Sequence, residues 1–364
     1  MQLVIEKNFL DDFFALVPRG ETFWYQDFEY FLKKRAKGFV LSTDFSNKIE
    51  LFAAFQDNPL WEYVSDNSDN YTFDTALNDS IENSTFYARN SVFKLFCTTK
   101  TDVECKDLEE KYGYMYLNIN TLKDKWALFQ SDRDDASLAI DTTSNPRFDN
   151  WAAIQAFKHP IRSMIISDLY LLDNSQTPPT DPNKVDKTQP LDKNLYPLLL
   201  NLLEDVALEN PLELLLLVKK SAIDTQNRIP FLPAFPNNKL QKMGKEIETF
   251  FQDNFTKLKV NLTIVHYTGS LQPNEKEHDR GIYTNYFFFE IGAGINLFNS
   301  SNQLRNRSTL NTHFLLKLPG KNIGFSGLRS FRDYIDSVVI SHGATSLDYF
   351  YNYSGNLLLS DSAL

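Results

Sequence analysis

The sequence is poor in residues that crosslink a protein or anchor it in a membrane. It has two cysteines, Cys97 and Cys105, among 364 residues. Two thiols are too few for a disulfide framework or a four-cysteine zinc site, so we expect both to be reduced. The longest apolar run, Leu212–Val218, contains Glu213 and is far too short to span a bilayer. No apolar stretch follows a basic region near the N-terminus. The sequence therefore predicts no signal peptide and no transmembrane segment. We expect a cytoplasmic location.

The chain also lacks an excess of positive charge, since its net charge is −10. An acidic chain does not coat nucleic acid or an anionic membrane non-specifically. This argues against a free-standing DNA-binding protein, but not against a local basic patch or a subunit of a larger complex. Aromatic side chains are abundant, with 30 Phe and 17 Tyr, which suits thick sheet cores or surfaces that contact other proteins.

Alternating strand and helix patterns predict an α/β fold made of two domains. Residues 1–130 are expected to form the N-terminal domain, with strands at Leu3–Glu6, Gly38–Ser42, Val92–Thr98 and Tyr114–Ile119. The stretch Asp66–Ser84, rich in Asp, Asn and Ser, indicates a surface loop. The polar stretch Ser131–Asn150 is the expected domain boundary, and residues 150–364 are expected to form the second domain with a C-terminal extension.

The second domain shows a further alternation of buried strands and amphipathic helices. Its expected elements are the strands Met164–Ser167, Glu213–Lys219 and Lys259–His266 and the helices Leu195–Glu209 and Lys239–Phe255. An aromatic hairpin is expected from Tyr283–Ile291 and Ile295–Phe298, joined by a tight turn at Gly292-Ala293-Gly294. In the extension, strands are expected at Phe314–Leu318 and Val338–Ser341, on either side of a helix at Leu328–Ile335.

One segment carries most of the chemical information: Glu277–Phe298 reads EHDRGIYTNYFFFEIGAGINLF. His278 stands two residues before Arg280 at the mouth of an expected strand, so both side chains lie on the same face. An imidazole there could attack or protonate a substrate, and a guanidinium could hold a phosphate oxygen. The later glycines allow a close backbone approach to an anion.

This spacing resembles the signature of the phospholipase D superfamily, His-x-Lys-x4-Asp followed by a glycine-rich turn and Asn. Here the pattern reads His278-x-Arg280-x4-Asn285, and then Gly292, Gly294 and Asn296. The sequence is more similar still to the phospholipase D-like C-terminal domain of microtubule-interacting-and-transport (MIT) domain proteins. That branch has a His-Asp-Arg core and an upstream strand that ends in Asp-x-Tyr, here Asp168-Leu169-Tyr170. The similarity covers residues of about 155–300 and implies a phospholipase D-like α/β domain.

The resemblance also implies a set of site residues, and no metal ligand among them. The implied phosphate-binding residues are His278, Arg280, Asn285, Gly292, Gly294 and Asn296, supported by Asp168 and Asp279. Active members of the superfamily need two His-x-Lys motifs, one His as nucleophile and the other as acid. This chain has a single His-x-Arg, so catalysis by His278 requires a homodimer. Arg keeps the phosphate-binding charge, whereas Asn285 lacks the orienting carboxylate. Anion binding without chemistry, and a purely structural role for the motif, are the alternatives.

The N-terminal domain resembles PIN-like nucleases more faintly. In that family an acid follows the first strand, and a later strand is followed by Thr-x-Asp and a helix. Here Glu6 follows the first expected strand, and Thr99-Lys100-Thr101-Asp102 follows Val92–Thr98. Carboxylates at strand ends could bind Mg²⁺ for hydrolysis, although Lys7 beside Glu6 opposes a metal ion. No cofactor is expected unless this domain is an active nuclease.

Three functions fit these observations. The leading hypothesis is a component that recognises a phosphate group or nucleic acid through a degenerate phospholipase D-like site, in a larger protein assembly. Pairs of domains of this kind resemble accessory proteins of bacterial antiphage defence, an analogy that rests on fold. The alternatives are a nuclease or phosphodiesterase, which uses His278 in a dimer or the N-terminal acids, and a protein-binding scaffold subunit.

Overall fold

The computed structural model of the protein divides the chain into two units. It describes residues 1–16, 23–36, 39–75, 92–129, 137–140, 148–168, 171, 191–219, 237–267, 280–292, 294–299, 301–304, 307–317 and 323–360. Unit 1 comprises Met1–Asp134, Phe314–Ser326 and Ser360–Leu364, and unit 2 comprises Asp135–His313 and Gly327–Leu359. The change at residue 134 falls inside the expected boundary. The sequence predicts one domain for all of residues 150–364, whereas two segments of the extension belong to unit 1.

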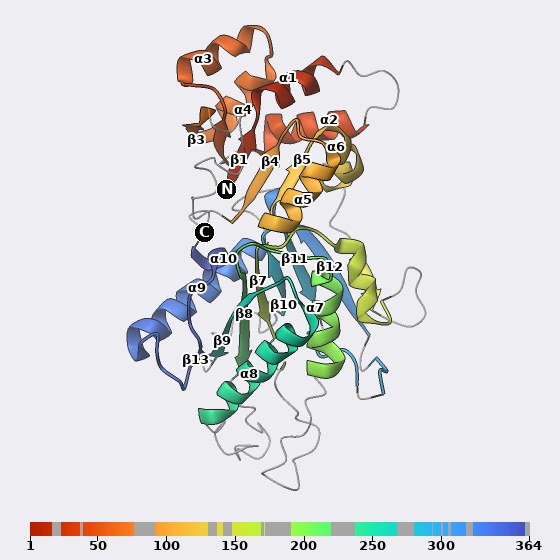
Figure 1. Cartoon of the computed structure of the whole chain (residues 1–364), viewed down its shortest axis with the longest axis vertical. Helices are drawn as coiled ribbons and strands as arrows, with labels where there is room; N and C mark the ends of the chain where they lie inside the picture. The colour runs from red at the N-terminus through yellow and green to blue at the C-terminus, as the bar shows by residue number, and fades with distance from the viewer. Residues whose placement is uncertain are drawn as a thin grey trace. The chain divides into compact units, whose positions relative to one another are not determined.

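Unit 1 is built on a five-stranded sheet in which every described pair of neighbouring strands is parallel. The strand order is β3 (Ser68–Phe73), β2 (Phe39–Thr43), β1 (Gln2–Ile5), β4 (Lys94–Cys97) and β5 (Met115–Leu117) (Figure 1). Val4 in the central strand pairs with Ser42 on one side and Phe96 on the other. The α/β fold class expected from the sequence is confirmed.

Unit 1 also contains helices, which alternate with several of its strands along the chain. They are α1 (Lys7–Ala15), α2 (Phe23–Tyr30) continued by the π-helix Phe31–Arg35, α3 (Lys48–Ala53) with the 3-10 turn Ala54–Gln56, α4 (Leu60–Asn67), α5 (Asp102–Tyr112) and α6 (Ile119–Lys125) with the 3-10 turn Trp126–Phe129. Helix α5 begins at a capping box, in which Thr101 accepts from the Glu104 N–H and the Glu104 carboxylate accepts from the Thr101 N–H. It ends at Gly113, whose φ of 72° is the left-handed conformation that favours glycine at a helix end.

Unit 2 is built on an eight-stranded mixed sheet. The strand order is β13 (Phe350–Tyr351), β9 (Val260–Tyr267), β8 (Leu212–Lys219), β7 (Ser163–Ser167), β10 (Gly281–Thr284), β11 (Phe287–Ile291), β12 (Ser308–Phe314) and β6 (Ser137–Ile140). Strands β7, β8 and β9 are parallel, and β10 and β13 lie antiparallel to them. The run LELLLLVK of β8 is nearly all apolar, as expected for a parallel strand buried on both faces.

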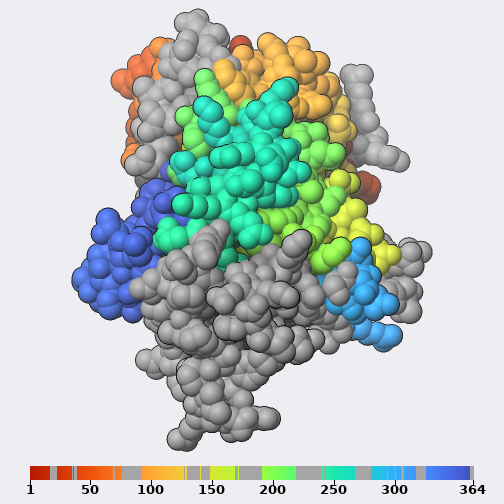
Figure 2. All heavy atoms as spheres, turned by 60° about the horizontal axis from the view of Figure 1, so that its bottom comes forward, coloured from red at the N-terminus to blue at the C-terminus, as the bar shows by residue number. Residues whose placement is uncertain are grey.

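Helices α7 (Tyr196–Leu203) and α8 (Asn237–Asn254) lie together on one face of β7, β8 and β9, and their side chains form one continuous surface (Figures 1 and 2). The Tyr196 and Phe250 rings of these helices stack with centroids 4.0 Å apart. The same unit contains the 3-10 helix Trp151–Phe157, the π-helix Leu191–Leu195, most of α9 (Ile323–His342) and most of α10 (Leu357–Ser360). The 3-10 turn Leu315–Lys317 belongs to unit 1. Helix α9 packs on β10 through the Phe331 and Tyr283 rings, which meet edge to face at 5.4 Å.

Four elements differ from the sequence prediction. The expected strand Phe314–Leu318 is one of them, because β12 ends at Phe314 and Leu315–Lys317 forms a 3-10 turn. The aromatic hairpin turns at Asn285–Tyr286, between β10 and β11, and not at the glycines. The Thr284 hydroxyl stabilises that turn by accepting from the Phe287 N–H at 2.9 Å. Val338–Ser341 lies within α9 and is not a strand, because its apolar residues continue the helical spacing of the preceding turns. The expected loop Asp66–Ser84 contains the edge strand β3.

In the part of the chain that the structure describes, no helix combines the length and the apolar character needed to cross a bilayer. Both cysteines are free thiols, each 1% exposed. Burial raises the pKa of the Cys97 thiol well above its usual value, and that of Cys105 to about 12. Neighbouring acidic groups, Glu109 beside Cys105 among them, add to the effect. Neither thiol is therefore a reactive nucleophile near neutral pH.

We expect both thiols to resist alkylation in the folded protein and to react fully after denaturation. Iodoacetamide labelling at mildly alkaline pH, with and without guanidinium, checks this by intact mass. Rapid labelling of either cysteine without denaturant would show that the thiol is accessible and would contradict the burial described above.

Candidate functional site

Three of the motif residues of unit 2, Asp168, Arg280 and Gly294, lie together at the carboxyl edge of β7, β8 and β9. Asp168 follows β7, and its N–H donates to the Leu217 carbonyl of β8 at 3.2 Å. Arg280 precedes β10, which runs antiparallel to β7 with Gly281 opposite Ser167. The end of β7 and the start of β10 therefore bring Asp168 and Arg280 to the same edge of the sheet. Sequence reasoning grouped these two residues only through the resemblance.

The backbone at Gly294 packs directly against Asp168 and Arg280. Its φ is +77°, and a Cβ atom there would lie 2.7 Å from Asp168 Oδ2 and 3.1 Å from Arg280 Cδ. The next residue, Ile295, donates its N–H to Asp168 Oδ2 at 2.6 Å. The backbone thus approaches the two side chains so closely that only glycine fits. The close approach to an anion that the sequence predicts for this position stays a prediction.

Asn194 is a site residue that the sequence did not reveal. It is fully buried in the π-helix that precedes α7. Its Nδ2 donates to Asn296 Oδ1 at 3.1 Å and to the Phe298 carbonyl at 3.0 Å, and its Oδ1 accepts from the Phe298 N–H at 2.8 Å. One side chain therefore fixes the segment that contains Asn296. No spacing rule connects residues about a hundred positions apart, so only the fold could show this.

The remaining motif residues have different positions. Asn285 is buried at the opposite end of β10, where its Oδ1 accepts from the Arg162 N–H at 3.0 Å. Five residues of extended chain separate it from Arg280, about 16 Å, so the structure does not bring Asn285 to the cluster. Gly292 contacts β12, since its N–H donates to the Thr309 carbonyl at 3.3 Å. His278 and Asp279 lie outside the described residues.

The cluster of Asp168, Arg280 and Gly294 is suited to holding an anion. Arg280 is half-buried, and a guanidinium can donate two parallel hydrogen bonds to a phosphate. Asp168 is 2% exposed, and its carboxylate orients the backbone of Ile295. In this arrangement the arginine is the side chain that can offer positive charge to an anion, and the carboxylate and glycine pack beside it.

The carboxyl edge of the unit 1 sheet is the second candidate. In an open parallel sheet, ligands usually bind where the strand order reverses, which here is between β1 and β4. Glu6 follows β1 at that point. Its carboxylate accepts from the Thr98 hydroxyl at 2.6 Å, the Thr99 N–H at 2.7 Å and the Thr99 hydroxyl at 2.9 Å. The side chain that could bind a metal ion therefore accepts three hydrogen bonds from the residues that follow β4.

Asp44 lies beside Glu6 at the end of β2 and was missed from the sequence. Its Oδ1 accepts from the Lys7 N–H at 2.7 Å and from the Thr43 hydroxyl at 3.2 Å. Burial raises the pKa of Asp44, the hydrogen bonds oppose this shift, and the nearby charge of Glu6 adds to it. The carboxylate is thus held at the start of α1 and partly destabilised in its charged form.

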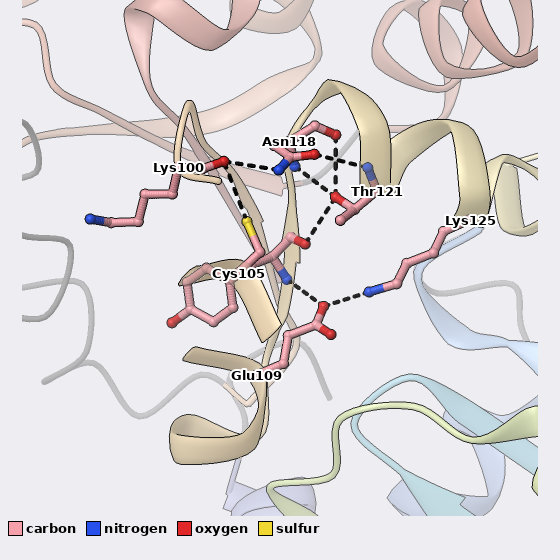
Figure 3. A network of polar contacts seen from close by, with 7 residues as sticks. Lys100, Cys105, Glu109, Asn118, Thr121 and Lys125 are labelled. Carbon is pink, nitrogen blue, oxygen red and sulfur yellow. Dashed lines mark hydrogen bonds and ion pairs between the residues drawn. The ribbon is translucent and has the colours of Figure 1, made fainter. Parts of the chain in front are cut away.

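Asp102, the acid of the Thr-x-Asp pattern, takes part in a polar network around α5 and β5. Asn118 Nδ2 donates to Asp102 Oδ1 at 2.7 Å and to the Lys100 carbonyl at 2.9 Å. Figure 3 shows this amide between α5 and α6, with the Lys100 ammonium pointing away from it (Figure 3). In the same network Glu109 accepts from the Tyr116 N–H at 3.0 Å and pairs with Lys125. Burial raises the pKa of Glu109 although Lys125 opposes that shift. These contacts tie the end of the sheet to its helices.

The carboxylates of Glu6 and Asp102 in unit 1 are held by donors of the chain itself. Among the described residues, no group of three or more His, Cys, Asp or Glu side chains is placed to hold a metal ion. Glu6 and Asp102 come from the positions that the PIN-like pattern predicted, but hydroxyl, amide and backbone donors bind both. No reaction step through a metal ion follows from this geometry.

Comparisons of the chain with models of protein families, with curated proteins and with solved structures found no match. The phospholipase D-like and PIN-like resemblances therefore stay predictions. What the two edges can bind has to be argued from their geometry.

The raised pKa of Asp44 makes a prediction for stability. An acid whose folded-state pKa is raised stabilises the protein below its unfolded pKa of about 4 and loses that contribution as pH rises through the folded value. Asp44→Asn keeps the acceptor for Lys7 and removes the titrating group. We therefore expect the free energy of unfolding of Asp44→Asn, relative to that of wild type, to increase as pH rises from about 4 to 7. Denaturant unfolding of both proteins at the two pH values measures this difference.

The exposed Asp57 of unit 1 offers the matched control, as Asp57→Asn. A stability difference between Asp44→Asn and wild type that does not grow with pH, or that grows equally for Asp57→Asn, would refute the assignment.

A second prediction concerns Gly294. We expect Gly294→Ala to destabilise the protein by about 2 kcal/mol or more, because it adds a steric clash with Asp168 to the strain of a positive φ. Gly343→Ala isolates the strain, since Gly343 has a φ of +81° and a Cβ atom there would meet nothing within 4 Å. Equal losses in the two variants, measured by urea unfolding, would mean that the close approach at Gly294 has no energetic weight.

Proposed function

We propose that unit 2 binds a phosphate-bearing ligand at the carboxyl edge of its sheet, without catalysing a reaction. The observation that supports this most is the convergence of Asp168, Arg280 and Gly294 at one point, from three separate parts of the chain. A half-buried arginine beside a rigid glycine turn is a geometry that suits phosphate.

Binding is favoured over catalysis by what surrounds Arg280. Asp168 accepts a short hydrogen bond from a backbone amide, and Gly294 covers it, so this carboxylate is a positioning group. Asn194 and Asn296 bond to each other and to the backbone. Among the described residues of the cluster, the side chains thus supply one cation and a fixed wall, with no acid and base pair for hydrolysis.

The charge of the chain makes such binding depend on this local site. A protein with a net charge of −10 repels polyanions at long range. An anion that binds must therefore be held by close contacts, and a short ligand with one or two phosphates gains more here than a long duplex does.

The test is to titrate inorganic phosphate, and a short fluorescent single-stranded oligonucleotide with a terminal phosphate, into wild type and Arg280→Gln. We expect Arg280→Gln to weaken binding of both probes about tenfold or more, since a hydrogen bond to a charged group contributes about 1.5–3 kcal/mol. Phosphorus NMR follows the first probe and fluorescence anisotropy the second.

Arg332→Gln is the matched control, because it removes the same charge from α9 of the same unit. Equal weakening in both variants would mean general charge attraction. If wild type binds neither probe, the protein-binding scaffold would be the alternative that is left. Cleavage of the oligonucleotide that is lost in His278→Ala and unaffected by EDTA would replace the proposal with the enzyme alternative.

A further inference from the structure

Unit 1 exposes apolar side chains on α3. Ile49 is 82% exposed and Phe52 is 44% exposed. The two residues are three positions apart and so share one face of the helix. Single exposed apolar residues are common on protein surfaces, but an exposed group that continues into neighbouring elements indicates an interaction site.

Half-buried aromatic rings continue this face from α3 to the edge strand β3. The Phe52 and Phe55 rings have centroids 5.1 Å apart, and the Tyr71 and Phe73 rings stack at 6.5 Å. Lys48 joins the two pairs, with its ammonium 5.0 Å from the Phe52 centroid and 4.8 Å from the Tyr71 centroid. We call the set of Ile49, Phe52, Phe55, Tyr71 and Phe73 the aromatic row.

The rings of this unit attract ammonium groups. The face of an aromatic ring carries partial negative charge and binds a nearby cation. Besides Lys48, Lys33 lies 4.8 Å over the Tyr63 ring. Lys48 itself is exposed, so exchanging its ammonium for one from another molecule would require little desolvation. The position between Phe52 and Tyr71 is thus a cation site that the chain fills with its own lysine.

The chain segment that contains the aromatic row is acidic. Between Ser46 and Phe73 the sequence has one basic residue, Lys48, against five acidic ones, which are Glu50, Asp57, Glu62, Asp66 and Asp69. Phosphates would be repelled by this segment, and a second copy of the chain would bring the same acidic charge to it. A cationic partner complements it.

We propose that the aromatic row binds a segment of a partner protein in which Lys or Arg residues alternate with apolar ones in helical spacing. The apolar side chains of that segment cover Ile49 and Phe52. One of its cations takes the place of Lys48 between Phe52 and Tyr71. This inference concerns unit 1 and does not depend on the anion site of unit 2.

The experiment uses the full chain and two synthetic helical peptides with the same leucine positions, one with Lys and Arg and one with Glu at the polar positions. We expect fluorescence anisotropy to show binding of the basic peptide only. Ile49→Ser should weaken it about tenfold, because covering one large apolar side chain contributes about 1.5–3 kcal/mol. Ile340→Ser is the matched control, since Ile340 on α9 is 84% exposed.

Lys48→Gln tests the exchange of cations. If the cation of the peptide replaces Lys48, this variant binds the basic peptide at least as tightly as wild type does. Weaker binding by Lys48→Gln would overturn the exchange. Binding of neither peptide, equal binding of both, or equal effects of Ile49→Ser and Ile340→Ser would overturn the proposal. The proposal would also be overturned if wild type bound an oligonucleotide and Ile49→Ser did not.

Discussion

Parallel strands end together, and this constraint determines where polar chemistry can occur in both units. The central strands of each sheet are buried on both faces, as Ile5, Phe96, Ile166 and Leu216 are, so they have little room for charged side chains along their length. Charge is instead concentrated where the strands end. Glu6 and Asp44 follow β1 and β2 in unit 1, and Asp168 follows β7 in unit 2. Among the described residues, these three acids therefore lie at the carboxyl edges of the two sheets.

A buried carboxylate at such an edge needs donors, and the sequence supplies them in both units. Glu6 receives three hydrogen bonds from Thr98 and Thr99, and Asp168 receives the Ile295 N–H. Because these donors belong to the chain, the acids fix the ends of neighbouring strands against each other. The two edges differ in the charged group that lies beside the acid. In unit 2 the half-buried Arg280 stands beside its acid, whereas in unit 1 Asp44 is an additional acid and repels Glu6. The edge in unit 2 is thus the better candidate for an anion.

The sequence predicted those elements whose pattern is local and strong. The apolar run of β8, the apolar end of β7 and the helical spacing of α8 lie within a few residues of their expected positions. It failed where a competing contact decides the structure. The glycines at 292 and 294 suggested a hairpin turn. Gly294 is instead required because its backbone packs against Asp168, and the hairpin turns earlier in the chain, where the Thr284 hydroxyl accepts from the Phe287 N–H. The polar residues of β3 suggested a loop. The pairing of β3 with β2 depends on the fold and cannot be read from the composition of β3. The role of Asn194 depends on a partner far away in sequence, and no periodicity could indicate it.

The two proposed sites, one for an anion and one for a cation, depend differently on the net charge of the chain. Long-range attraction favours cations throughout, because the net charge is −10. The aromatic row contains the exposed Ile49 and Phe52 and belongs to an acidic segment of the chain, so a cation at this row would benefit from that attraction, and salt would weaken its binding. Arg280 is half-buried and acts at short range, so binding there depends on hydrogen-bond geometry more than on the field of the whole protein. Raising the ionic strength should therefore weaken the binding of a basic peptide far more than it weakens the specific contribution of Arg280. A reversed order of salt sensitivity would mean that the two surfaces have been assigned the wrong ligands.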